Sequence, residues 1–220
     1  MNTLSNCQRL LRSVAGDDLW GQGCYLVPFA DIAAYEPLLR VDYCRAWTSS
    51  FLDLMLCDWL SSRGLWIGRG FATVINTDLI SPTTQDFVGI VFHECAHHIC
   101  RPLPENIGDD NLTEFSRACV EAFADSNDGT RPEQLTPWDD HGLDFVRASC
   151  HLAHRVAKVV ESVRPCHLRF ASQYYPLPFN EAAFMTALAD ELDRTGSIRD
   201  ILATPAPEAF SQRWQEATSQ

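Results

Sequence analysis

Apolar residues in the first third of this chain fall into two short runs and one helical repeat. Residues 24–27 and 71–77 are rich in branched and aromatic side chains, which favour β-strands. Residues 41–62 place Cys, Trp, Phe and Met side chains near one face at helical spacing. The pattern therefore predicts a strand, an amphipathic helix and a second strand, in that order.

A longer apolar segment follows and predicts a buried helix over residues 83–100. Ser-Pro-Thr-Thr at 81–84 offers an N-cap and an early proline, and Asp86 supplies an acid in the first turn. The run from Ile90 to Ile99 contains one formally charged residue, Glu94. A solvated helix would carry more charge, so we expect this one to lie in the core.

The second half of the chain alternates predicted helices with turn-rich loops. We expect helices over residues 114–125, from 143 to about 163 and from about 181 to 194, with loops at 101–112 and 126–140. The tail from Pro205 onward is expected to be loosely attached. We interpret residues 1–220 as one domain, with a core over about 20–165 and a C-terminal helical extension over about 166–220.

The predicted helix over residues 83–100 carries the sequence His93-Glu94-Cys95-Ala96-His97. Side chains four residues apart lie on the same helix face, so both imidazoles can bind one Zn²⁺ at about 2.0–2.1 Å. A bound zinc ion lowers the pKa of its water toward about 7, and the adjacent Glu94 is placed to accept the proton. The pattern therefore indicates a hydrolytic zinc site with Glu94 as general base.

A strand, a short turn and an H-E-x-x-H helix follow one another over residues 71–100, and this order resembles the zincin metallopeptidases. The resemblance covers this region alone. It implies an α+β, zincin-like fold: a small mixed sheet with the strand of 71–77 at its edge beside the active-site helix, and predominantly helical structure elsewhere. It also implies that an extended peptide substrate pairs with that edge strand.

Catalytic zinc needs a third protein ligand, and the sequence offers two candidates, His141 and Glu121. His141 begins His-Gly-x-x-Phe, which resembles the third-ligand motif of SprT-like zincins and would let Phe145 anchor the next helix under the site. The gap from His97 is longer than is usual in that group. Glu121, with Asp125 four residues later, resembles the glutamate helix of the gluzincins. We favour His141 narrowly, and Glu121 remains the alternative.

Composition limits the partners and the location. A formal net charge of −12 argues against nucleic acid, whose phosphates an acidic protein repels. The sequence has no stretch long enough to cross a membrane and no basic-then-apolar start, so we expect neither membrane insertion nor a signal peptide. Nine cysteines, an odd number without a C-x-x-C pair, suit reduced thiols and a cytoplasmic location. The sequence leaves the oligomeric state undefined.

Together these features predict a zinc-dependent metallopeptidase-like hydrolase that acts on a protein or peptide. Two alternatives remain open at this point: a zincin-fold binding or regulatory protein that does not cut its partner, and a zinc hydrolase that acts on a non-peptide amide. Catalysis requires Glu94 whereas binding does not, so the intact glutamate favours an enzyme.

Overall fold

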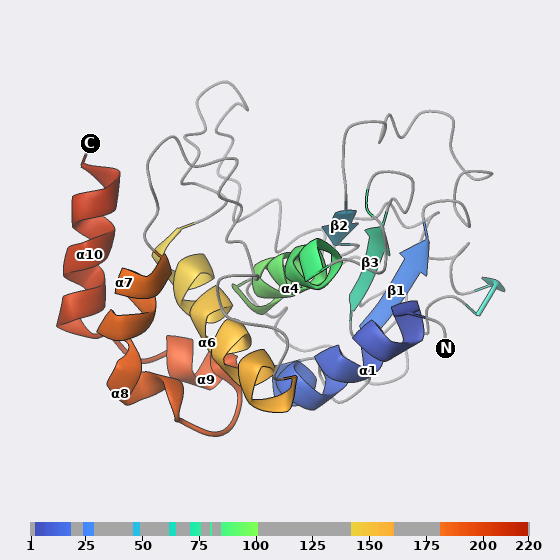
Figure 1. Ribbon diagram of the computed structural model, residues 1–220, viewed down its shortest axis with the longest axis horizontal. Helices are drawn as coiled ribbons and strands as arrows, with labels where there is room; N and C mark the ends of the chain where they lie inside the picture. Colours follow the sequence, from blue (N-terminus) through green and yellow to red (C-terminus); the bar gives the residue numbers. More distant parts are fainter. Residues whose placement is uncertain are drawn as a thin grey trace.

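The computed structural model describes residues 3–18, 24–28, 46–48, 62–64, 71–75, 80, 85–100, 142–160 and 181–219. Its helices are α1 (Thr3–Ala15), the 3₁₀ helix η1 (Gly16–Asp18), α4 (Gln85–Cys100), α6 (Leu143–Val159), α7 (Glu181–Ala187), α8 (Ala189–Leu192), α9 (Ile198–Leu202) and α10 (Glu208–Thr218). Its strands are β1 (Cys24–Pro28), β2 (Ala46–Thr48) and β3 (Phe71–Ile75). Helix α4 lies between the strands on one side and α6 with the C-terminal helices on the other (Figure 1).

The three strands are ordered β1-β3-β2, with β3 parallel to β1 and antiparallel to β2. The predicted α+β, zincin-like fold with residues 71–77 at the edge of the sheet is wrong. The described part of the chain is mostly helical, and β3 is the central strand. Thr73 and Ile75 of β3 are both fully buried, so this strand has neighbours where the prediction placed a free edge. A peptide cannot pair with β3 as expected, since both of its sides already bind strands.

The predicted helix over 41–62 is wrong at residues 46–48, which form β2. Trp47 pairs with Val74 and Thr48 with Thr73, so these residues join the sheet. Both Trp and Thr suit a pleated surface, and here pairing with β3 prevails over the helical spacing of the apolar residues. The rest of that predicted helix lies outside the described residues, apart from Ser62.

The other predicted elements differ from the structure mainly at their ends. The strands at 24–27 and 71–77 and the helices at 83–100 and 143–163 are present as β1, β3, α4 and α6. The single helix expected over 181–194 is instead two helices, α7 and α8, with Leu188 between them. The predicted helix at 114–125 and the two predicted loops lie outside the described residues.

The helices and strands share one core, to which α1, β1, β3, α4, α6 and the C-terminal helices all contribute. Leu11 of α1, Phe92 of α4 and Phe210 of α10 are each at most 2% exposed. The expectation of a loosely attached tail is therefore wrong, because Phe210 anchors α10 against Phe184 of α7 with ring centroids 5.3 Å apart. In the described part of the chain, no helix combines the length and apolarity needed to cross a membrane.

Candidate metal centre

Helix α4 brings His93 and His97 together as the sequence predicts. Their Nε2 atoms lie 3.2 Å apart, and the two rings are nearly perpendicular, with centroids 4.7 Å apart. Two nitrogens bound to one zinc at about 2.0–2.1 Å and separated by the tetrahedral angle would lie about 3.3–3.4 Å apart. The observed separation therefore fits two neighbouring corners of a zinc tetrahedron without rearrangement of the helix.

The same separation also permits a hydrogen bond between the imidazoles, in which one Nε2–H donates to the other Nε2. Metal binding requires a lone pair on each nitrogen, so the shared proton would have to leave when a cation enters. Both histidines are half-buried.

Phe145 of α6 forms the apolar support of the two rings. Its ring centroid lies 4.5 Å from that of His97 and 4.9 Å from that of His93, and Phe145 is 2% exposed. The prediction that Phe145 anchors the following helix under the site is confirmed. Contact with one rigid aromatic ring restricts the rotation of both imidazoles and holds their nitrogens in position.

Glu94 and His98 occupy the same helix with different surroundings. Glu94 is half-buried, next to His93 in sequence and three residues before His97, which is a spacing of neighbours on a helix surface. His98 is 4% exposed, so it is a core residue as expected. Its backbone carbonyl accepts a hydrogen bond of 2.7 Å from Arg199 Nη2, which caps this end of α4.

The third metal ligand is not found within the described ranges, where no group of three His, Cys, Asp or Glu residues could hold a metal ion. His141 and Glu121, the two predicted candidates, lie outside these ranges. Gly142, bonded to His141, has φ −69°, a value open to any residue, so the backbone at this position does not require glycine. Gly142 begins α6 one turn before Phe145, since Val146 N–H donates to its carbonyl at 3.1 Å.

No protein-family model matches this chain. Neither the curated proteins nor the solved structures compared with it contain a match. The chemistry of the site therefore has to be argued from its own residues.

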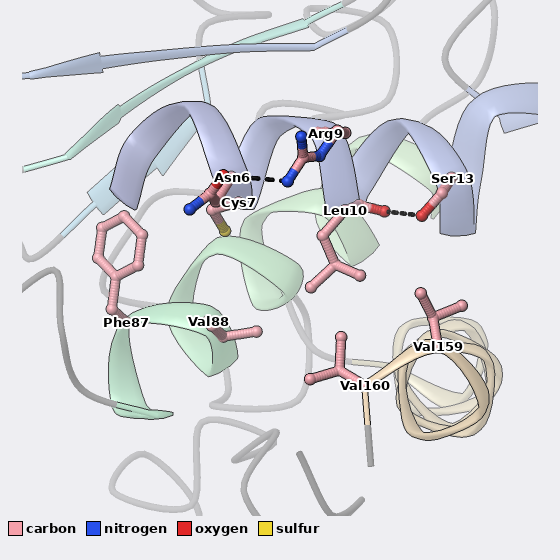
Figure 2. A pocket seen from close by; sticks show the side chains of 9 residues that line it. All are labelled: Asn6, Cys7, Arg9, Leu10, Ser13, Phe87, Val88, Val159 and Val160. Carbon is pink, nitrogen blue, oxygen red and sulfur yellow. Dashed lines mark hydrogen bonds between the residues drawn. The ribbon is translucent and has the colours of Figure 1, made fainter. Parts of the chain in front are cut away.

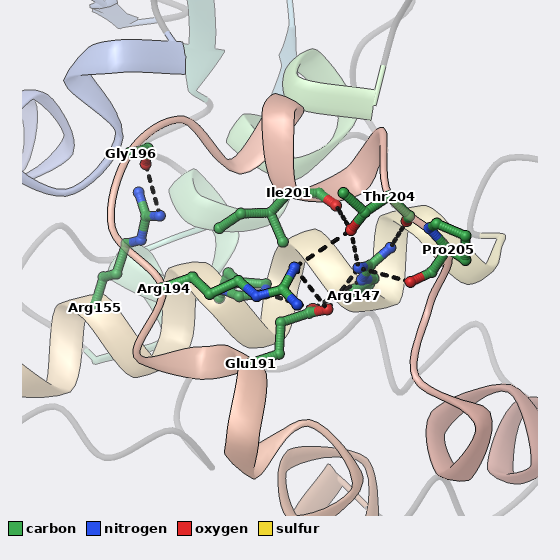
Figure 3. Close-up of polar contacts among 9 residues, drawn as sticks. Arg147, Arg155, Glu191, Arg194, Gly196, Ile201, Thr204 and Pro205 are labelled. Carbon is green, nitrogen blue, oxygen red and sulfur yellow. Dashed lines mark hydrogen bonds and ion pairs between the residues drawn. The ribbon is translucent and has the colours of Figure 1, made fainter.

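Arg147 of α6 belongs to a second cluster, on another face of that helix (Figure 3). Arg147 donates from Nε and Nη2 to the two carboxylate oxygens of Glu191, at 2.8 and 2.6 Å, and from Nη1 to the Thr204 carbonyl at 2.7 Å. His151 Nε2 lies 2.9 Å from Glu191 Oε1. All three charged or polar side chains are at most 3% exposed.

These interactions occupy side chains that the sequence also offers to the metal site. By residue type, Arg147 and Arg155 could stabilise an oxyanion, and His151 could be an outer partner of the metal ligands. Arg147 and His151 instead bind Glu191 of α8, and they connect α6 with the C-terminal helices. Arg155 donates to the backbone carbonyls of Val14 and Gly196 at 3.3 and 2.8 Å. Tyr174 and Tyr175, two further candidates of this kind, lie outside the described residues.

Sequence reasoning missed Asp18, which positions α9 against the end of α4. Its carboxylate accepts hydrogen bonds from Ser197 Oγ at 2.7 Å, Ile198 N at 3.0 Å and Arg199 N at 2.9 Å. Asp18 thus caps α9 from a distant part of the chain and holds Arg199 where it reaches the His98 carbonyl. An acid in η1 gives no sequence signal of this role, since its partners lie about 180 residues away.

Proposed function

We propose that this protein is a zinc-dependent hydrolase whose metal is held by His93 and His97 and whose general base is Glu94. The observation that supports the proposal is the convergence of the two Nε2 atoms to 3.2 Å on one helix face. The i, i+4 spacing puts both imidazoles on one face of α4, and their nitrogens lie close to the edge length of a zinc tetrahedron. His141 is proposed as the third ligand and Glu121 as the alternative.

Zinc bound at this point would acidify a water molecule and polarise the carbonyl of a substrate. The protein's own residues then have separate tasks. Glu94 accepts the proton of the water and passes it to the leaving group, which is the role of a carboxylate beside a histidine ligand. Phe145 keeps water away from the rear of the imidazoles and fixes their orientation.

We propose a peptide or protein as the substrate, because the H-E-x-x-H arrangement is typical of peptide hydrolysis. The binding mode expected along residues 71–77 is not part of this proposal, since β3 is flanked by strands on both sides. The cysteines fit a cytoplasmic enzyme, because Cys7, Cys95, Cys100 and Cys150 are in the reduced thiol form.

The test combines zinc content with turnover in the same preparations. Elemental analysis should find about one zinc per chain in the wild type and in Glu94→Gln, and little in His93→Ala or His97→Ala. Hydrolysis of a mixed fluorogenic peptide library should be lost in all three variants. His154→Ala is the matched control: its Nε2 lies 3.1 Å from an Asp193 oxygen, away from the site, and it should keep both metal and turnover.

The third ligand is identified by the same assay on His141→Ala and Glu121→Ala. Loss of a direct ligand should remove most of the zinc, whereas loss of an outer partner should weaken zinc binding about 10- to 100-fold. Zinc retained in both His93→Ala and His97→Ala would overturn the proposal. One zinc per chain without turnover on any amide would favour a binding protein.

A further inference from the structure

Helix α1, the start of α4 and the end of α6 surround a cavity of about 560 Å³ that the proposed hydrolase does not use (Figure 2). This volume lies in the range of small-molecule sites, about 300–1,000 Å³. On α4 the cavity is bordered by Phe87 and Val88, which lie between one and two turns before His93 and point to other faces of the helix. The cavity is therefore separate from the candidate metal centre.

The interior of the cavity is apolar. Leu10 from α1, Phe87 and Val88 from α4, and Val159 and Val160 from the end of α6 line it. Val159 is 57% exposed, and in the described part of the chain it is the one large hydrophobic side chain that is so open to solvent. A hydrocarbon ligand would cover this surface, and the burial of its own methylene groups would favour binding.

The polar lining all comes from α1, and its available N–H donors belong to Arg9 and Asn6. Arg9 Nη2 donates to Asn6 Oδ1 at 3.1 Å, which uses the acceptor oxygen of Asn6 and leaves its amide N–H groups. The Ser13 hydroxyl donates to the Leu10 carbonyl at 2.8 Å. Arg9 has further guanidinium N–H groups, so the rim can bind an acceptor, and above all an anion.

The charge around the rim favours an anion as well. Helix α1 contains Arg9 and Arg12 and no acidic residue, although the whole chain has a formal net charge of −12. Both arginines are exposed. Arg9, which lies at the rim, therefore gives this part of the cavity a local attraction for an anion.

We propose that this cavity binds the monomeric form of a medium-chain aliphatic carboxylate, with the alkyl chain against the valines and the carboxylate at Arg9 and Asn6. An apolar interior with donors at one rim matches such a ligand at both ends. The site is independent of the zinc chemistry, and a ligand there would contact the first turn of α4.

The test uses sodium decanoate below its micelle concentration and protein with ¹³C-labelled valine and leucine methyl groups. Titration should shift the methyl signals of Val88, Val159 and Val160 saturably, and calorimetry should give the Kd. Arg9→Gln should weaken binding about threefold to tenfold. Arg12→Gln is the matched control on the same helix, and it should change the Kd less than about twofold.

Two further comparisons test the two ends of the ligand. Hexanoate is four methylenes shorter than decanoate and should bind at least about tenfold more weakly. 1-Decanol lacks the negative charge, and its Kd should be at least about threefold higher than that of decanoate. Val159→Trp should reduce decanoate binding by filling the open end of the cavity, and its exposure makes the change tolerable to the fold.

Three results would overturn the proposal. One is the absence of saturable shifts at the three valines. Another is an equal loss of decanoate affinity in Arg9→Gln and Arg12→Gln, which would show a diffuse electrostatic attraction to α1 and no defined binding site. The third is binding to phosphatidylglycerol vesicles without binding to decanoate, which would identify a membrane-facing surface.

Discussion

Glu191 carries a negative charge in the interior because two partners share it. Burial by itself would raise the pKa of this carboxyl, but hydrogen bonds from Arg147 and His151 and the charge of Arg147 outweigh burial and lower it from 4.5. Burial lowers the pKa of His151 from 6.5, more strongly than the hydrogen bond to Glu191 raises it. The cluster is thus an Arg–carboxylate pair with a neutral imidazole attached at neutral pH.

Glu191→Gln should destabilise the fold by about 3 kcal/mol at pH 7, because it leaves the buried guanidinium of Arg147 without a counter-charge. Chemical denaturation measures the loss. Arg194→Gln is the control: Arg194 is half-exposed, its Nη1 lies 3.8 Å from the same carboxylate, and the change should cost less than about 0.5 kcal/mol. Equal effects of the two substitutions would contradict a buried pair.

The pH dependence of this cluster has a defined sign. The lowered pKa of Glu191 stabilises the fold above pH 4.5, and this contribution is lost as pH falls below that value through the lowered pKa. The lowered pKa of His151 acts in the same direction, beginning as pH falls below 6.5. The stability difference between the wild type and Glu191→Gln should therefore shrink below pH 4.5.

Glu181 shows the opposite behaviour. Burial raises the pKa of its carboxyl from 4.5 to about 7, and its Oε1 has no hydrogen-bond partner among the described residues. A raised pKa means that the fold loses stability as pH rises from 4.5 through about 7. The free energy of unfolding of Glu181→Gln should exceed that of the wild type by about 1 kcal/mol at pH 8 and by little at pH 5. This value allows for the partial solvation of Glu181. A gain that is the same at both pH values would rule out titration of Glu181 as its cause.

At the scale of elements, the short helix α9 connects the N-terminal region with the end of α4. Asp18 accepts three hydrogen bonds at its start, and Arg199 from its first turn caps the His98 carbonyl. Five residues do not form a stable helix alone, so these contacts hold α9 in place. The C-terminal end of the candidate metal helix depends on them.

Asp18→Ala should cost about 2–3 kcal/mol, since it leaves buried donors of α9 unsatisfied. Ser197→Ala should lower the free energy of unfolding by about 1 kcal/mol, because it removes one of the three bonds to Asp18 and the weak cap in which Asp200 N–H donates to Ser197 Oγ. Asp200→Ala, an exposed acid of the same helix, should change the free energy of unfolding by less than about 0.5 kcal/mol. Thermal or urea unfolding ranks the three variants, and a different order would refute the proposed role of Asp18.

The sequence predicts an element well when the residues that determine it are close together in the chain. Helix α4 has a start sequence, an apolar run and two histidines at helical spacing, and all of these act within about 20 residues. Strand β2 was predicted as helix because its pairing with β3 is set by residues about 27 positions away. Helix α1 was overlooked although Leu4, Cys7, Leu11 and Val14 repeat at helical spacing.

The same distinction applies to the candidate site. The face shared by His93 and His97, and the support from Phe145, follow from local spacing and from one motif. The Arg147–Glu191–His151 cluster joins residues 40 and 44 positions apart, and no periodicity of either segment indicates their pairing. A histidine such as His151 gives the same sequence signal whether it lies beside a metal or in a buried cluster of this kind.

At the scale of the whole molecule, zinc should stabilise the folded state if the proposed centre binds it. Addition of a chelator to the zinc-loaded protein should lower the free energy of unfolding by about 2.7 kcal/mol at a free zinc concentration 100 times the Kd. Differential scanning calorimetry measures the shift. In His97→Ala the chelator should have no effect, and an equal shift there would mean that zinc binds elsewhere.

The bonds between Asp18 and α9 also affect how the chain can be made. The partners of Asp18 lie about 180 residues further along, and Arg155 likewise reaches back to the Val14 carbonyl. During synthesis from the N-terminus, α1 can pack on β1 soon after both have left the ribosome, whereas residues 197–199 are added much later. The Asp18 carboxylate therefore stays without these three donors until almost the whole of this sequence has been translated.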